Sequence, residues 1–210
     1  MENLAAFGNT PIEYATLVAM LSHYKSPKDK IAALEKQKKL IRIKKGLFVA
    51  VPKDGTGSIC RELIANHLYG PSYISLESAL SFHNLIPERV YSVLSVTTKR
   101  SKKYNTPFGI FDYRTVLPSY FSIGIQLQKS DNKTAFLMAS PEKALCDMIL
   151  LSSGLRLQSS KAVKSYLEED LRLDLPEKQR WNSQIILDCL NVGKKKTELT
   201  QLLKFFKNYE

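Results

Sequence analysis

The sequence predicts an α+β protein with two parts, a short basic unit at the amino-terminal end and a larger mixed unit after it. Helical periodicity over residues 10–39 is followed by two short runs of β-branched residues, which indicate a hairpin. A turn-rich stretch at 53–57 then predicts a linker. Short branched and aromatic runs at about 90–140 predict a small antiparallel sheet, and helical patterns over 141–208 predict a C-terminal helical bundle.

Composition limits the class of protein. With 210 residues, of which 44% are hydrophobic, the chain can bury one or two cores. We find neither a targeting segment nor an apolar run of the roughly 20 residues that a membrane helix needs, so we expect a soluble, cytoplasmic protein without membrane contact. Cys60, Cys146 and Cys189 are odd in number and far apart in apolar helical contexts. This pattern predicts buried free thiols, with no metal and no cofactor.

The amino-terminal unit begins with a helix pattern. Residues 10–13, Thr-Pro-Ile-Glu, are typical of a capping box with proline at the first helical position. A second helix follows a short turn, because Ser26 is a favoured N-cap and Pro27 suits the first turn. The inward face of this second helix is thin, with Ile31 and Leu34 as its apolar residues.

The second helix leads directly into the predicted hairpin. Residues 40–44 alternate apolar and basic side chains, Lys45-Gly46 allows a tight reversal, and residues 47–51 form a second β-rich run. Two helices followed by a basic hairpin are typical of a winged helix-turn-helix, which we predict for residues 1–52. The larger unit would then occupy residues 58–210.

Positive charge is concentrated in the amino-terminal unit. The chain has a formal net charge of +11, and residues 1–53 contain ten Lys/Arg but only four acidic residues. Such a concentration attracts phosphate backbones through counterion release. In a helix-turn-helix the second helix enters the major groove, while other cations hold phosphates. The DNA-binding candidates are therefore Ser26, Lys28 and Asp29 for bases, Lys30, Lys36 and Lys39 for phosphates, and Arg42, Lys44 and Lys45 in the wing.

Two alternatives concern the basic segments. A lysine-rich helix is often only a solvated face, and the basic hairpin beside it is what favours the DNA interpretation here. A second candidate basic patch lies in a predicted loop of the larger unit, where an ordinary exposed loop explains the charge equally well. Its members are Lys99, Arg100, Lys102 and Lys103.

The larger unit contains recognisable helix starts and no catalytic motif. Ser75 and Ser140 are N-cap candidates, and Lys143 and Asp147 have the spacing of an i,i+4 ion pair. A nucleotidyltransferase needs a Gly-Ser loop followed by two carboxylates one residue apart, and Gly57-Ser58 has no such pair after it. Phosphate-binding GKS/T, G-x-S-x-G and H-E-x-x-H motifs are also missing, so we expect no catalytic residues and no enzyme activity.

Three segments follow one another in the order IRIKKGLFV at 41–49, YISLESALSFHNLIP at 73–87 and MASPEKALCDMIL at 138–150. In this order they resemble the AbiEi antitoxins of type IV toxin-antitoxin, or abortive phage infection, operons. The resemblance covers about Tyr14 to Ile149 and is weaker over the final helices. One departure is that Gln37-Lys38-Lys39 stands where a glycine is expected to close the reading helix.

The resemblance implies a bacterial repressor that binds inverted repeats in its own promoter and takes part in phage defence. It also implies a nucleotidyltransferase toxin, of AbiEii type, as functional partner without a stable complex. We expect a monomer or weak dimer, with cooperative binding on DNA as an option. Two alternatives remain: a winged-helix regulator that senses a small ligand, and an RNA-binding protein that protects the toxin's substrate.

Overall fold

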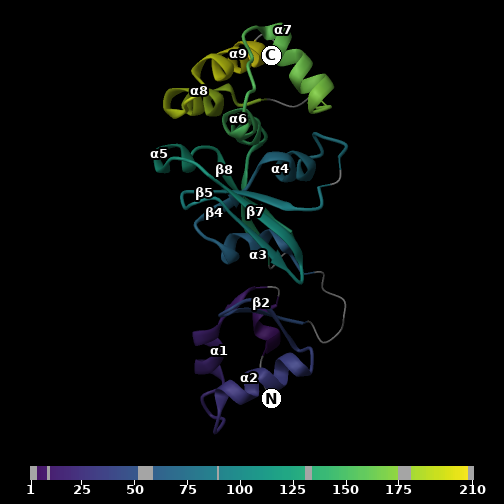
Figure 1. Cartoon of the computed structure of the whole chain (residues 1–210), viewed down its shortest axis with the longest axis vertical. Helices are drawn as coiled ribbons and strands as arrows, with labels where there is room; N and C mark the ends of the chain where they lie inside the picture. Colours follow the sequence, from purple (N-terminus) through teal and green to yellow (C-terminus); the bar gives the residue numbers. More distant parts are fainter. Residues whose placement is uncertain are drawn as a thin grey trace.

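The computed structural model describes residues 4–8, 10–51, 59–88, 90–130, 134–174 and 181–207. The predicted linker at 53–57 lies outside the described residues. Within the described ranges the chain is α+β, as predicted. Figure 1 shows the amino-terminal unit at one end of the molecule, a larger sheet in the middle and the C-terminal helices at the other end.

The amino-terminal unit combines helices with a three-stranded antiparallel sheet of order β1-β3-β2. β3 lies in the centre of this sheet, so the strand that precedes the helices pairs with the last strand of the unit. The elements are the 3₁₀-helix η1 (Leu4–Phe7), β1 (Ile12–Glu13), α1 (Tyr14–Met20), α2 (Pro27–Lys36), β2 (Leu40–Lys44) and β3 (Leu47–Ala50).

The predicted capping box at residues 10–13 is wrong. Glu13 is the N-cap of α1 and makes no side-chain cap hydrogen bond. Ile12 and Glu13 instead form β1, in which Ile12 lies opposite Phe48 of β3. Pairing with β3 buries Ile12 to 2% exposure, and this long-range contact outweighs the local helix-start pattern.

The second helix starts where the sequence predicts and ends without glycine. The Ser26 hydroxyl caps α2 by accepting from the Asp29 backbone N–H at 3.4 Å. At the other end Lys38 has φ of 56°, the left-handed conformation that glycine adopts without strain. The Lys39 N–H then reaches back to the Leu34 carbonyl at 3.0 Å, which closes the helix. Lys38 therefore takes the position where glycine was expected.

Both faces of the small sheet are buried. Ile12, Leu40 and Phe48 pack with Leu17 and other apolar residues of α1 and α2 in one core. Three other buried side chains of the hairpin belong to the core of the larger unit, and these are Ile43, Leu47 and Val49. The sheet is thus held between the helices of its own unit and the larger unit, and α2 lies on the side away from the larger unit (Figure 1).

The larger unit is built on a six-stranded sheet of order β6-β7-β5-β4-β9-β8. The predicted small antiparallel sheet is wrong in size and in direction, because the β4–β9 and β5–β7 pairs are parallel. The short strand β4, which sequence patterning missed, lies between β5 and β9. The elements are α3 (Arg61–Leu68), β4 (Ser72–Ile74), α4 (Leu76–Phe82), β5 (Val93–Thr97), β6 (Lys102–Thr106), β7 (Gly109–Thr115), α5 (Pro118–Phe121), β8 (Ile125–Lys129) and β9 (Ala135–Ala139).

Helices cover the sheet on both faces and continue beyond it. α3 lies on the face toward the amino-terminal unit, and α4 and α6 lie on the opposite face (Figure 1). The predicted C-terminal helices are present as α6 (Pro141–Leu151), α7 (Ser160–Ser165) with the π-helix η2 (Tyr166–Asp170), α8 (Ser183–Val192) and α9 (Lys196–Lys207). The three cysteines are free and buried, as predicted. Among the helices described, none has the length and apolar character that crossing a bilayer requires.

Candidate nucleic-acid interface

The outer surface of α2 carries most of the predicted DNA-binding residues. Lys28, Asp29 and Lys36 are exposed on the helix, and Lys39 is exposed just after it. Ser26 is half-buried, since it caps the helix. Within the described part of the chain, Lys28, Lys36 and Lys39 form no ion pair.

Three more lysines lie on or beside α2, and the prediction omitted two of them. Lys30 is half-buried, with its ammonium 4.6 Å from the centre of the Tyr24 ring. Lys25 and Lys38 are exposed at the two ends of α2. The sequence could have indicated Lys25 as a DNA-binding candidate because it directly precedes the N-cap. It could have indicated Lys38 because this residue occupies the helix end that lacks glycine. We name the exposed set Lys25, Lys28, Lys36, Lys38 and Lys39 the α2 surface.

The three predicted wing residues point to different surroundings. The Arg42 guanidinium donates to both carboxylate oxygens of Glu35, from Nε at 2.9 Å and from an Nη at 2.6 Å. This ion pair raises the pKa of Arg42 and ties its side chain to α2. Lys45 is exposed at the hairpin turn. Arg42 is thus already paired, whereas the charge of Lys45 is presented to solvent.

Lys44 turns toward the larger unit. Its ammonium donates to the carbonyl of Leu68 at the end of α3 and lies 5.8 Å from the centre of the Tyr104 ring. Burial lowers the pKa of Lys44, the nearby ammonium groups of Lys102 and Lys99 lower it further, and Glu13 acts in the opposite direction. The structure therefore separates Lys44 from the α2 surface and brings it to the second basic patch.

The second basic patch is only partly a loop. Lys99 and Arg100 lie between β5 and β6, but Lys102 and Lys103 begin β6, so the prediction of a loop is wrong for these two. They pair with β7, opposite Tyr113 and Asp112, and the alternation of a strand sends successive side chains to opposite faces. Patterning missed this strand because an edge strand with exposed lysines shows no apolar alternation. All four cations of the patch are exposed.

A buried polar cluster lies between the central sheet and α6. The Lys143 ammonium is 3.2 Å from Asp147, in the predicted i,i+4 pair, and both side chains are completely buried. Asp147 also accepts from the Tyr73 hydroxyl at 3.0 Å and from the Ser75 hydroxyl at 2.6 Å. Lys143 donates to the Tyr120 carbonyl at 3.0 Å. Since these groups have no access to solvent, the cluster holds helices and strands together and offers no binding surface.

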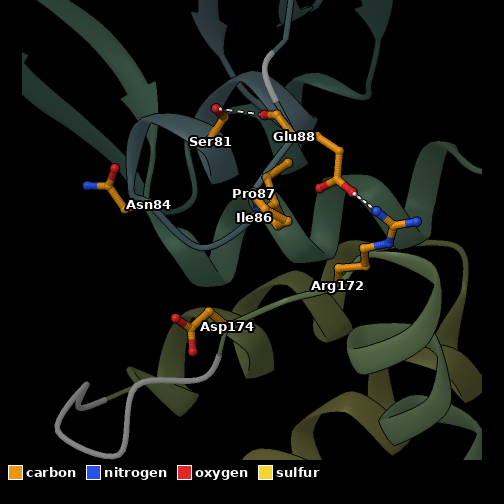
Figure 2. Close-up of a pocket in the computed structure, with 7 residues that line it drawn as sticks. All are labelled: Ser81, Asn84, Ile86, Pro87, Glu88, Arg172 and Asp174. Carbon is orange, nitrogen blue, oxygen red and sulfur yellow. Dashed lines mark hydrogen bonds and ion pairs between the residues drawn. The ribbon is translucent and has the colours of Figure 1, made fainter.

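An open pocket of about 500 Å³ lies where α4 ends near the segment after η2. Figure 2 shows Glu88 and Arg172 meeting across it, and their ion pair is 3.4 Å long; Asp174 lies on the same side as Arg172. The Ser81 hydroxyl donates to the Glu88 carbonyl at 3.2 Å. The pocket is lined by two carboxylates and by one guanidinium that is already paired with Glu88. This charge balance does not favour an anionic ligand. No group of three or more metal-ligand side chains gathers among the residues described.

Comparison with protein-family models gives no match to this chain, and comparison with curated proteins gives no relative.

Proposed function

We propose that this chain is a DNA-binding transcriptional regulator that reads the major groove with α2. In this proposal the amino-terminal unit is a winged helix-turn-helix, with α1 and α2 as the helix pair and β2 and β3 as a short wing. The topology supports the assignment, because the strand before the helices pairs with the outgoing strand of the hairpin. The N-terminal end of α2, where a reading helix contacts bases, is exposed at Lys28 and Asp29.

The observation that carries the proposal is the α2 surface. Five exposed lysines belong to one short helix and its two ends. Figure 1 shows that this helix lies at the end of the molecule away from the larger unit, so the larger unit leaves room for a duplex to approach it. Each lysine that meets a phosphate contributes about one released counterion to binding.

We further propose that the regulator is the antitoxin of a type IV toxin-antitoxin operon and represses its own promoter. This part depends on the resemblance to the AbiEi antitoxins. The segments 73–87 and 138–150, which carry part of this resemblance, meet in the core, because Ser75 donates a hydrogen bond to Asp147. The larger unit would then be the effector part that opposes a nucleotidyltransferase toxin.

The two alternatives have weaker support. A ligand sensor needs a largely apolar pocket with a few converging polar groups, and the pocket in Figure 2 is open and lined by an existing ion pair. An RNA binder needs free aromatic faces for stacking. Tyr104 is half-buried, and Lys102 lies 4.7 Å from the centre of its ring.

The test is binding to the inverted repeats of the chain's own promoter by variants of matched charge. Lys28→Ala with Lys36→Ala removes two cations from α2, and Lys204→Ala with Lys207→Ala removes two exposed cations from α9 at the opposite end of the molecule. For the α2 variant, the slope of log K against the logarithm of the salt concentration should become shallower by up to about two units. Its melting temperature should not change, because exposed charges contribute little to stability. Equal slopes for the two variants, or no preference of the native protein for its promoter, would refute the proposal.

A further inference from the structure

Three ammonium groups from three segments gather around two tyrosine rings where the units meet. Lys102 lies 4.7 Å from the centre of the Tyr104 ring and 5.8 Å from that of Tyr69. Lys44, from the hairpin of the amino-terminal unit, lies over the same Tyr104 ring, and Lys99 lies 5.3 Å from the centre of Tyr69. We name Lys44, Lys99 and Lys102 the junction lysines.

The rings themselves form a fixed platform. Tyr69, Tyr104 and Tyr113 have centroids 5.3 to 5.9 Å apart. Tyr113 is completely buried, and its hydroxyl donates to the Ala65 carbonyl of α3 at 2.7 Å. The junction lysines therefore lie over rings that pack against one another, and the buried ring among them is hydrogen-bonded to α3.

The positive charge of this cluster is only partly compensated. Lys44 and Lys99 donate to the carbonyls of Leu68 and Gly70 at the carboxyl end of α3, where a helix favours cations. Each ammonium has three hydrogens, so these contacts leave most of its donors free. None of the junction lysines forms an ion pair within the part of the chain that the structure describes, and Lys99 and Lys102 are exposed. Mutual repulsion between the three is therefore relieved best by an anion.

We propose that the junction lysines bind a phosphate group. Such a group offers several acceptor oxygens and about two negative charges as a free anion, or one in a nucleic-acid backbone. Because Lys44 belongs to the amino-terminal unit and Lys99 and Lys102 to the larger one, the phosphate connects the two units. The site is separate from the α2 surface, so it does not depend on the proposed reading of DNA by α2.

The first experiment titrates the full-length protein with inorganic phosphate at constant ionic strength, with chloride as the competing anion. Binding is followed by ³¹P line broadening and by calorimetry. Lys102→Ala is expected to weaken phosphate binding by about tenfold or more, as is Lys44→Ala, because each removes charge-assisted hydrogen bonds. The matched controls are Lys103→Ala, the next residue on β6, and Lys45→Ala, the next residue of the hairpin. Both are exposed, and both variants should bind like the native protein.

The second experiment identifies the source of the phosphate. If it belongs to a nucleic-acid backbone, Lys99→Ala with Lys102→Ala lowers the salt slope of duplex binding by up to about two units, beyond the effect of Arg100→Ala with Lys103→Ala, which removes the same charge from exposed positions. If it belongs to a free anion, that slope is unchanged while the ³¹P signal is lost. Equal phosphate binding by Lys102→Ala and Lys103→Ala, or none by the native protein together with an unchanged slope, would overturn the proposal. Because the first experiment contains no DNA, it tests the phosphate site whether or not α2 binds DNA.

Discussion

The buried pair of Lys143 and Asp147 gives the sharpest prediction for stability. Asp147→Asn keeps the size of the side chain and its ability to accept hydrogen bonds from Tyr73 and Ser75. It removes the negative charge 3.2 Å from an ammonium that is completely buried. Breaking one side of a buried pair costs about 3–5 kcal/mol. With a urea m-value of about 2 kcal/mol/M, the unfolding midpoint should fall by about 2 M.

A second pair with the same spacing provides the control. Lys164 and Glu168 lie 3.8 Å apart with side chains 61% and 45% exposed, so Glu168→Gln should change the free energy of unfolding by no more than about 0.5 kcal/mol. The assay is urea unfolding followed by the fluorescence of Trp181, the single tryptophan, which is 4% exposed against Phe206. If Asp147→Asn loses no more than Glu168→Gln, the argument from burial is refuted.

Two further predictions concern the helix end at Lys38 and the thiol of Cys60. The left-handed conformation of Lys38 costs about 1 kcal/mol that glycine avoids, although glycine loses about 0.5–1 kcal/mol through the unfolded chain. The stability of Lys38→Gly, measured by thermal melting, should therefore equal or exceed that of the native protein. The free energy of unfolding of Lys38→Val should be lower than the native value by about 1 kcal/mol or more. The reverse order would contradict the assigned conformation. Burial raises the pKa of the Cys60 thiol to about 11, so at pH 8 about a thousandth of it is thiolate. Iodoacetamide labelling read by peptide mass spectrometry should be at least about a hundredfold slower in the native chain than in the urea-unfolded chain, and should speed up as the pH rises toward 11; comparable rates would show an accessible thiolate.

The sequence predicted correctly those features that neighbouring residues alone determine. Ser26 and Ser140 cap their helices, and each hydroxyl accepts from the backbone N–H three residues on. The spacing of Lys143 and Asp147 indicated their ion pair. Such features depend on neighbours within one or two turns, which a sequence displays directly.

Features set by distant partners were missed. Ile12 became a strand residue because of Phe48, and β4 is three residues whose place depends on β5 and β9. The same reason explains the candidate site. Sequence indicated that Lys44 and Lys102 were basic surface residues, but only the packing of the units brings both over Tyr104. The sequence also predicted Arg42 as a DNA contact, because nothing in the pattern indicated that its side chain pairs with Glu35.

The packing of the small sheet against the larger unit has a practical consequence for experiments on separate parts of this protein. A fragment ending at residue 51 would expose Ile43, Leu47 and Val49 to water on one side of a three-stranded sheet. Those side chains would favour self-association, so the oligomeric state and DNA affinity of such a fragment would describe an artificial contact. Studies of the amino-terminal unit are better served by point variants in the intact chain.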